Sequence, residues 1–221
     1  MRKIIPILSV VFLFTWNSCV NEPPNEIIQT DQRVFMPDIT DGLTVKESEA
    51  HSRKVHNTVL ENTVGRRVPD TRIFTTGGEQ LNLKNIIQPK TIVISSDAHC
   101  GWGTGGITND FPKAVKKIRD SHPEFDWNIL CLVKRDSSDF ENPAPFDRLI
   151  REVRPLYDTF YIIDEYESRK LNMFANPCRL YIGNDKVVSA MHMGTYLEVN
   201  TMYREVFNNT LRPEPKNSNT E

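Results

Sequence analysis

The residue best suited to chemistry in this sequence is Cys100, which lies in the stretch TIVISSDAHCGWGTGG, residues 91–106. An apolar, β-branched run leads to this cysteine, and a glycine-rich turn then leads towards a predicted helix. Unpaired backbone N–H groups and the helix dipole at such a position favour the thiolate, which is the reactive form of cysteine. We therefore interpret Cys100 as a nucleophile; the alternative is a small, buried apolar residue.

The other cysteines do not form a disulfide pattern. Cys131 lies in the middle of WNILCLV, which is typical of a strand buried on both faces, so we expect it to serve packing. If Cys19 is modified, as argued next, Cys100, Cys131 and Cys178 remain, and an odd number leaves at least one thiol unpaired. The sequence therefore predicts no disulfide scaffold.

The N-terminus is typical of an export signal. Two basic residues precede a mostly apolar run, residues 4–16, which is too short to span a membrane. Cys19 directly follows a small residue, which resembles a bacterial lipoprotein signal, although Trp16 replaces its usual aliphatic residue. We expect residues 1–18 to be a signal peptide and Cys19 to be lipidated, on the periplasmic or outer side of a membrane of the bacterial cell envelope. The alternative is a secreted protein in which Cys19 is free.

Length and composition indicate one globular domain. The chain has 221 residues, of which 38% are hydrophobic and 25% charged, with a formal net charge of -2. Its basic residues are scattered along the chain, so the sequence does not indicate that the protein binds nucleic acid. We expect a tether and N-terminal extension at residues 19–63, the domain at residues 64–211 and a disordered tail at residues 212–221.

Strands and helices alternate along the expected domain, which predicts an α/β fold with a mixed sheet. A helix starting at Asn109 or Asp110 is expected to follow Cys100, since Pro112 suits a first turn. The other expected elements are a helix at 47–62, a hairpin of 72–76 and 80–83, strands at 91–95, 127–133 and 160–163, helices at 146–157 and 166–174, a hairpin of 179–182 and 186–191, and a last helix at 196–211.

Three segments resemble the thioredoxin-like fold, and in particular its exported, membrane-tethered thiol-disulfide oxidoreductases (redoxins), which have an extra N-terminal β-hairpin. VGRRVPDTRIFTTGGEQLNLKNI, residues 64–86, is similar to the opening of such domains. Cys100 stands in the place of the first cysteine of the family's Cys-x-x-Cys. NPCRLYIGNDKVV, residues 176–188, is similar to the family's cis-proline strand and the hairpin after it. This resemblance covers the chain from about Val64 to Leu211.

The resemblance implies a set of site residues. Cys100 would attack a protein or small-thiol disulfide, and Cys178 would be its resolving thiol if the two Cα atoms lie within about 7 Å. Pro177 would face Cys100, and Asn176 would present its backbone to an extended substrate. Trp102 is expected either to contact substrate or to plug the loop. The resemblance implies no cofactor and no metal, and the sequence does not identify the external reductant.

Departures from the family pattern leave other functions open. Gly103 stands where the second cysteine would be, and the extended glycine-rich turn predicts a helix that starts several residues after Cys100. A non-catalytic binding module that has lost its dithiol is therefore the main alternative. A copper-handling protein is a minor one, with Cys100, Cys178 and the run Met191-His192-Met193 as soft ligands.

Two residues beside the cysteine have open roles. His99 could assist Cys100 when protonated, but neighbouring residues of an extended segment point to opposite sides. Asp97 could accept a proton, or it could bond to the backbone of the turn.

Overall fold

The computed structural model describes residues 24–31, 44–157 and 159–194, and it has an α/β architecture with one mixed sheet. The strand order is β2-β1-β5-β4-β3-β6-β7. The central strands β3, β4 and β5 are parallel, and β6, β7, β1 and β2 are antiparallel to their neighbours. The strands are β1 (Arg72–Phe74), β2 (Gln80–Asn82), β3 (Thr91–Asp97), β4 (Asn128–Arg135), β5 (Thr159–Asp164), β6 (Cys178–Ile182) and β7 (Val188–Met193).

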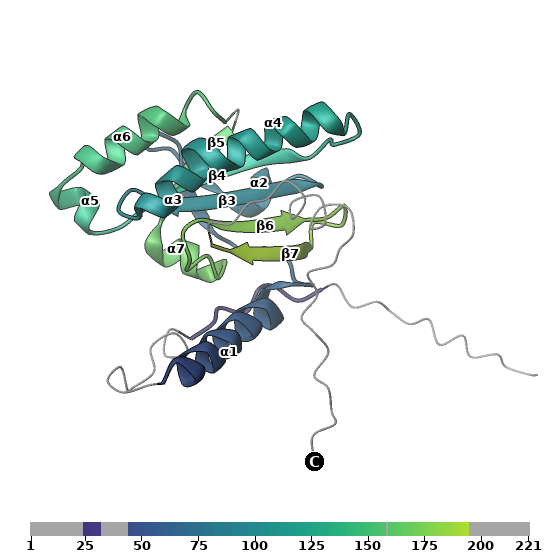
Figure 1. Ribbon diagram of the computed structural model, residues 1–221. Helices are drawn as coiled ribbons and strands as arrows, with labels where there is room; N and C mark the ends of the chain where they lie inside the picture. The colour runs from purple at the N-terminus through teal and green to yellow at the C-terminus, as the bar shows by residue number, and fades with distance from the viewer. Residues whose placement is uncertain (1–23, 32–43, 158, 195–221) are drawn as a thin grey trace, which may run out of the picture.

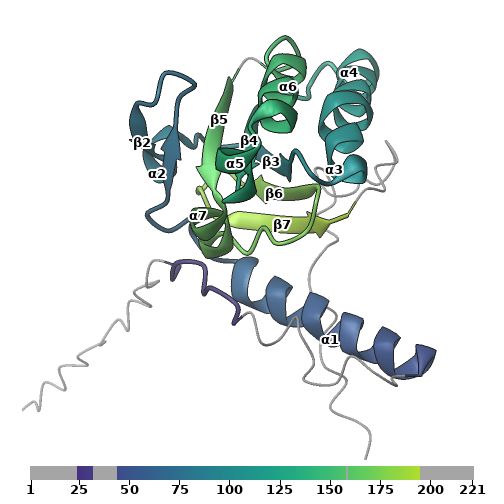
Figure 2. The ribbon, with the colours of Figure 1, turned by 90° about the vertical axis from the view of Figure 1, so that its left-hand side faces the viewer.

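Helices cover both faces of this sheet (Figure 1). The helical segments are α1 (Val45–Thr63), α2 (Leu83–Ile86), α3 (Gly101–Gly105), the π-helical η2 (Gly106–Asp110), α4 (Phe111–Ser121), α5 (Ser138–Glu141), α6 (Ala144–Val153) and α7 (Glu165–Lys170). Figure 2 shows α4 and α6 on one face and α1 on the other. The mixed sheet flanked by helices and the N-terminal hairpin β1–β2, both predicted from the sequence, are confirmed.

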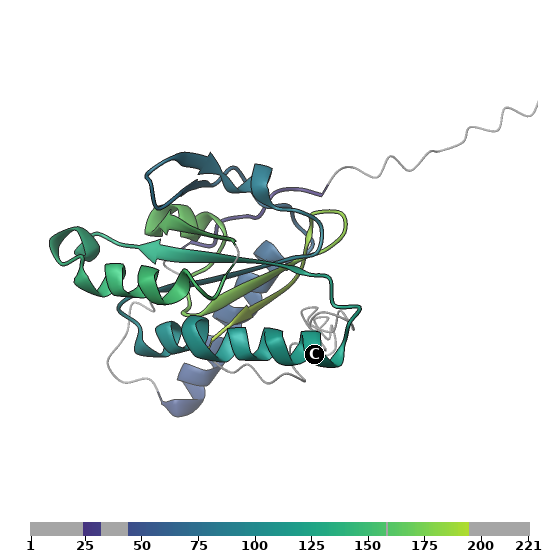
Figure 3. The ribbon, with the colours of Figure 1, turned by 90° about the horizontal axis from the view of Figure 1, so that it is seen from above.

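The pattern of side chains explains these layers. The strand β3 is buried on both faces from Thr91 to Ser96, as its apolar and β-branched sequence predicts. On one face of the sheet, Ile94 and Val133 pack with Phe111 and Ile118 of α4 and with residues of α6. Burial of this apolar surface fixes α4 over the parallel strands, and Figure 3 shows α4 and α6 side by side above the sheet.

The opposite face of the sheet packs against residues that precede Val64. Ile27, Val59 and Leu60 belong to its buried cluster, together with Cys178 and Leu180 of β6. A capping box at Thr44, whose side chain accepts from the Glu47 N–H, begins α1. Part of residues 19–63, the predicted tether and extension, therefore packs on the sheet. Its few apolar residues are too widely spaced to form a periodic pattern from which their burial could be predicted.

Three other predictions lie outside the described residues: the signal peptide, lipidation of Cys19, and the helix at 196–211 with the tail after it. Within the described part of the chain, no helix is long and apolar enough to cross a membrane.

Candidate functional site

The strand β3 delivers Cys100 to the start of a helix at the carboxyl end of the parallel strands (Figure 1). Cys100 is the N-cap residue of α3, with extended backbone angles of φ -94° and ψ 103°. The helix continues from α3 through η2 into α4 without a break in the chain. The helix predicted to start at Asn109 or Asp110 is present as α4, with Asp110 as its N-cap residue. The expectation that helical structure starts several residues after Cys100 is wrong, because Gly101 to Gly106 are helical despite their low helix propensity.

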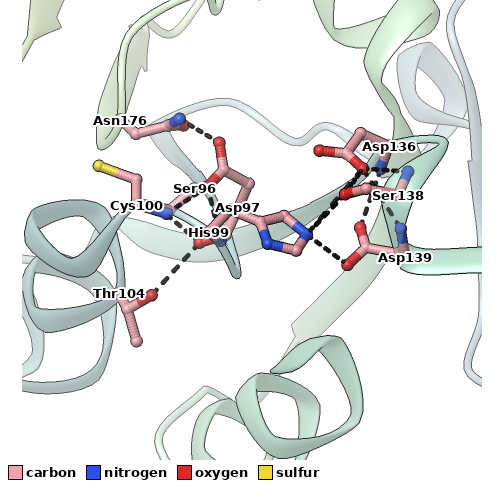
Figure 4. A network of polar contacts seen from close by, with 9 residues as sticks. All are labelled: Ser96, Asp97, His99, Cys100, Thr104, Asp136, Ser138, Asp139 and Asn176. Atoms are coloured by element: carbon pink, nitrogen blue, oxygen red, sulfur yellow. Dashed lines mark hydrogen bonds and ion pairs between the residues drawn. The ribbon is translucent and has the colours of Figure 1, made fainter. Parts of the chain in front are cut away.

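Asp97 holds the turn between β3 and this helix. Its Oδ1 accepts hydrogen bonds from the backbone N–H groups of His99 at 3.0 Å and Cys100 at 2.8 Å (Figure 4). Its Oδ2 accepts from the side-chain amide of Asn176 and lies 3.9 Å from the Lys134 ammonium. Such side-chain-to-backbone bonds fix a turn locally, so Asp97 sets the position of the cysteine.

The thiol of Cys100 faces backbone donors of the first helical turn. The N–H of Gly103 donates to Cys100 Sγ at 3.3 Å, and the residue is partly exposed. Free N–H groups and the positive end of the helix dipole at this position interact favourably with negative charge on sulfur. Cys100 is thus partly accessible, and its sulfur faces the first turn of the helix.

Gly103 leaves no space for a second thiol. A Cβ atom built on Gly103 would overlap Ser96 Oγ and lie 2.8 Å from Asn176 Cβ. Real Cβ atoms essentially never approach that closely, so strand β3 and the loop before β6 fill the place of the family's second cysteine. The side chains of Ser96 and Asn176 therefore occupy the space that a second cysteine at position 103 would need.

The loop before β6 packs against the same helix. The Asn176–Pro177 peptide bond is cis, and a Cβ atom on Gly106 would lie 2.8 Å from Pro177 Cγ. Glycines at positions 103 and 106 thus allow the loop to approach the helix closely. The structure brings Asn176 beside Asp97, whereas Pro177 packs on Gly106 of η2.

Cys178 has a very different environment from Cys100. It pairs with Ser95 in the sheet, is fully buried, and packs in the cluster with Leu180 and Met191. Burial raises the pKa of the Cys178 thiol to about 12, and burial also raises the pKa of Cys131. All three cysteines of the described part of the chain are free thiols, and Cys100 is the one among them that is not buried.

The buried side chain of Lys134 lies beside Asp97, which holds the turn after β3. The side chain of Lys134 is 7% exposed, and its Nζ donates to the carbonyl of Met173 at 3.5 Å. Burial lowers the pKa of Lys134, and the charges of Asp97 and Cys100 are among those that oppose this shift. Lys134, Asp97 and Asn176 also line a polar cavity of about 190 Å³ that extends towards α7.

The His99 side chain points away from Cys100. Its Nε2 lies 2.9 Å from Asp139 Oδ1 and 3.1 Å from Ser138 Oγ, both on α5 (Figure 4). Because both contacts involve the same ring nitrogen, these residues do not form the Ser-His-Asp relay of hydrolases, which uses both nitrogens. The sequence did not indicate this contact, since 40 residues separate its partners.

Two groups of side chains resemble metal ligands. His99, Asp136 and Asp139 place one ligand atom each within 4.8 Å of one another, but the aspartates already accept hydrogen bonds from the backbone of their own loop. Met191 and Met193 pack on the same face of the sheet as Cys178, and the cluster there is apolar. Cys178 and Met191 are buried, so they do not form the open set of soft ligands that a copper-handling site would need.

Two exposed aromatic side chains lie on α3 and α5, the helices that follow the carboxyl ends of β3 and β4. Trp102 in α3 is 79% exposed, and Phe140 in α5 is 67% exposed. Trp102 therefore does not plug the loop. Large apolar side chains that remain exposed beside a reactive group often serve binding.

No protein-family model matches the chain, and no curated protein matches it in sequence. Several solved structures are similar at low identity. A thiol:disulfide interchange protein from Bacteroides sp. is 13% identical over 62% of this chain and 86% of that chain, with a TM-score of 0.45. The thioredoxin domain of a thiol-disulfide oxidoreductase from Bacteroides vulgatus is 12% identical over 65% and 98%, with a TM-score of 0.45. A thioredoxin-like protein from Bacteroides caccae is 11% identical over 76% and 57%, with a TM-score of 0.48.

The predicted α/β fold, with a mixed sheet flanked by helices, is confirmed by the strand order of the sheet itself. Identities of 8–14% and TM-scores below 0.5 leave the function to be inferred from the side chains of the site.

Proposed function

We propose that this protein carries out thiol-disulfide exchange with Cys100 as its single reactive thiol. The observation that carries the proposal is the position of Cys100 Sγ, which is accessible at a helix N-terminus and bonded by the Gly103 N–H, next to a loop that contains a cis proline. Asp97 fixes the turn, and Gly103 excludes a neighbouring thiol. The substrate class is a protein disulfide or the disulfide of a small thiol.

The reaction has two exchange steps. The Cys100 thiolate attacks one sulfur of the substrate disulfide, so that a mixed disulfide forms and the other substrate sulfur leaves as a thiolate. An external thiolate then attacks the substrate sulfur of this mixed disulfide. Cys100 leaves as the thiolate, and the substrate half remains joined to the external thiol. Each step breaks one S–S bond and forms another, so no further oxidant or reductant is needed.

Asn176, Pro177 and Trp102 are proposed to bind the substrate. Asn176 and Pro177 form the loop that faces the first turns of the helix. An extended peptide would use the backbone of Asn176 there, since the Pro177 carbonyl already accepts from the Gly194 N–H. The exposed ring of Trp102 offers an apolar surface two residues from the thiol.

The proposal includes export and a lipid anchor at Cys19 in the bacterial cell envelope. Its support is the basic and apolar N-terminal segment followed by a cysteine. In such a compartment, thiols are oxidised unless a reductant maintains them, so the mixed disulfide of Cys100 would depend on the supply of an external thiol.

A resolving role for Cys178 is a variant of this proposal. Its thiolate would attack Cys100 in the mixed disulfide, which would release the reduced substrate and leave a Cys100–Cys178 disulfide. The burial of Cys178 and its raised pKa, about 12, oppose this step, because the thiolate is the attacking form. The variant therefore requires that β6 or the loop before it opens.

The second candidate function is a non-catalytic binding module. The packing that fills the place of the second thiol favours it, because the exposed Trp102 and the Pro177 loop could bind a peptide without chemistry. Such a module would not require a reactive Cys100.

The test is the reaction of the reduced, full-length protein, in detergent, with glutathione disulfide, followed by peptide mapping and intact mass. We expect one glutathione on Cys100, its release by added thiol, no reaction in Cys100→Ser, and unchanged reaction in Cys178→Ser. A Cys19→Ala variant excludes reaction of glutathione disulfide at Cys19 in any protein that carries no lipid there. Lack of reaction at Cys100 would favour the binding module, and an internal disulfide lost in Cys178→Ser would favour the resolving role.

A further inference from the structure

The first described residues, 24–31, form a short strap that is fixed to the domain. The N–H of Arg67 donates to the carbonyl of Asn25 at 3.0 Å, and the N–H of Ile27 donates to the carbonyl of Arg67 at 2.8 Å. The Ile27 side chain is buried in the cluster that lies between the sheet and α1. Backbone hydrogen bonds beside a buried apolar side chain thus hold the strap on the domain from Asn25 onwards.

A second set of hydrogen bonds fixes the rest of the strap. The Asn172 side chain accepts from the N–H of Thr30 at 2.8 Å and donates to the carbonyl of Ile28 at 3.0 Å. The same amide group donates to Thr63 Oγ1 of α1 at 2.8 Å. Asn172 is fully buried, so release of the strap would leave polar groups unpaired inside the protein. The strap is therefore part of the fold, and a tether on its N-terminal side has to end before Asn25.

The strap joins the domain at the end of the sheet that lies opposite Cys100. Arg67, its backbone partner, forms a bridge with Val187, just after the turn between β6 and β7. The last residue of β6 pairs with Thr91, the first residue of β3, so this turn lies at the start of β3. Cys100 follows the other end of β3, and Figure 1 shows α3 at the left end of the strands and the β6–β7 turn at the right end. Since β3 has 7 residues, the two ends lie about 20 Å apart.

Few residues separate the strap from Cys19, the proposed lipid anchor. Only residues 20–24 lie between Cys19 and Asn25. Consecutive residues advance by at most about 3.6 Å, so the Cα atoms of Cys19 and Asn25 lie within about 22 Å of each other. A free tether over residues 19–63 would reach several times further. A lipid on Cys19 would therefore keep the strap end of the sheet close to the bilayer surface.

Ion pairs occur among the charged side chains at the strap end. The Lys84 ammonium lies 2.8 Å from a carboxylate oxygen of Glu26 in the strap, and the Lys90 ammonium lies 2.7 Å from one of Asp126. These pairs make a surface of mixed charge rather than the basic patch that binds anionic lipid headgroups. The short tether, and not charge, is therefore the feature that would set the orientation of the domain.

Resting on the proposed lipid anchor, we propose that the bilayer faces the end of the sheet that carries the strap and the β6–β7 turn, and that Cys100 faces the aqueous compartment. The substrates are then disulfides dissolved in that compartment, because the membrane lies on the side of the domain opposite the thiol. A disulfide inside the bilayer would be out of reach of Cys100. The external thiol that releases the mixed disulfide is water-soluble for the same reason.

The experiment compares the distances of two labelled positions from a bilayer by resonance energy transfer. Asn184→Cys, in the β6–β7 turn, and Trp102→Cys, in α3, are each made in a Cys100→Ser protein, and the new exposed thiol carries the donor fluorophore. Cys131 and Cys178 are buried and stay unlabelled. Each lipidated full-length protein is bound to vesicles of phosphatidylethanolamine and phosphatidylglycerol whose outer headgroups carry the acceptor.

Energy transfer from position 184 is expected to be several times that from position 102, since β3 alone separates the two ends by about 20 Å. Vesicles of neutral phosphatidylcholine should give the same result, because the tether sets the orientation. The control protein has an insertion of about 30 glycine and serine residues after Val20, a linker that spans about 30 Å on average. In that protein, the two positions are expected to give similar, low transfer.

Equal transfer from the two positions in the protein with its natural tether would overturn the proposal, and so would stronger transfer from position 102. A protein without lipid on Cys19, shown by its intact mass and by failure to float with vesicles, would overturn it together with the proposed anchor. Failure of thiol-disulfide exchange is distinguishable from both results, because the labelled proteins lack Cys100 and their energy transfer does not depend on its chemistry.

Discussion

Gly103 packs directly against Asn176: a Cβ atom on the glycine would lie 2.8 Å from the Cβ of the asparagine. This contact joins the first turn of the helix to the loop that precedes Pro177. It places the loop that is proposed to bind substrate beside the first turn of the helix, and it removes the space of a second cysteine. The single-thiol chemistry proposed for Cys100 follows from this contact as much as from the residue types.

Gly103→Cys is therefore expected not to restore a working dithiol. The new side chain would force Ser96 or Asn176 to move, and overpacking of this kind costs about 1–3 kcal/mol of the free energy of unfolding. Gly105→Cys is the matched control, because a Cβ atom at Gly105 meets nothing within 4 Å. Urea unfolding of the reduced proteins measures the difference, and a Gly103→Cys protein as stable as the control would contradict the packing argument.

Asp97→Ala is expected to slow the reaction of Cys100 and to destabilise the protein. The substitution removes the acceptor for two backbone N–H groups and the partner of Asn176 and Lys134, which together amount to about 2–4 kcal/mol. The reaction rate with glutathione disulfide and the urea midpoint report the two effects. Asp97→Asn keeps an acceptor oxygen for the turn and is expected to retain more of both. Equal losses in the two variants would point to the charge of Asp97 rather than to the turn.

Stability is expected to depend on the buried Cys178 thiol at alkaline pH. Burial raises its pKa from about 9 to about 12 in the folded protein, so the unfolded chain loses this proton first. The contribution is fully present below the unfolded pKa, and it is lost as pH rises towards the folded pKa. The free energy of unfolding of the wild type relative to Cys178→Ala should therefore fall between about pH 9 and pH 12, by up to about 1.4 kcal/mol per pH unit. A difference that does not change with pH in this window would show that Cys178 is solvated.

Trp102→Ala is expected to change binding without changing stability. Since the side chain is 79% exposed, its loss should alter the free energy of unfolding by no more than about 0.5 kcal/mol. The rate with a peptide disulfide is expected to fall about fivefold, as for loss of one aromatic contact. Trp127→Ala is a useful contrast, because Trp127 packs edge-on against the buried Tyr181 and its loss should be destabilising. An unchanged peptide rate in Trp102→Ala would remove Trp102 from the substrate surface.

The sequence was sufficient for the features that depend on local pattern. The β-branched run at Thr91–Asp97, the alternating elements and the Asn176–Pro177 segment predicted the sheet and the place of the thiol. The sequence missed the helical turns between Cys100 and Asp110. The four glycines and the tryptophan at residues 101–106 have poor helix propensity, and contacts of Gly103 and Gly106 with the loop before β6 override it.

Contacts between distant residues were beyond prediction. His99 was correctly expected to point away from Cys100, but its partner Asp139 lies 40 residues later in a loop of ordinary polar composition. The same holds for Ile27, which joins the buried cluster from a segment rich in proline and acids. Such residues carry no periodic signal, because each contributes one contact rather than a repeated face.

The most direct test of the central claim is the fate of the mixed disulfide in a single turnover. Reduced full-length protein is mixed with one equivalent of a peptide whose cysteine is in mixed disulfide with 5-thio-2-nitrobenzoate, because the leaving thionitrobenzoate is too weak a nucleophile to reverse the exchange. The reaction is quenched with acid at increasing times and analysed by mass and peptide mapping. The account predicts an adduct on Cys100 that accumulates and persists until an external thiol is added. Rapid loss of the adduct with formation of a Cys100–Cys178 disulfide, or no adduct on Cys100 at all, would contradict it.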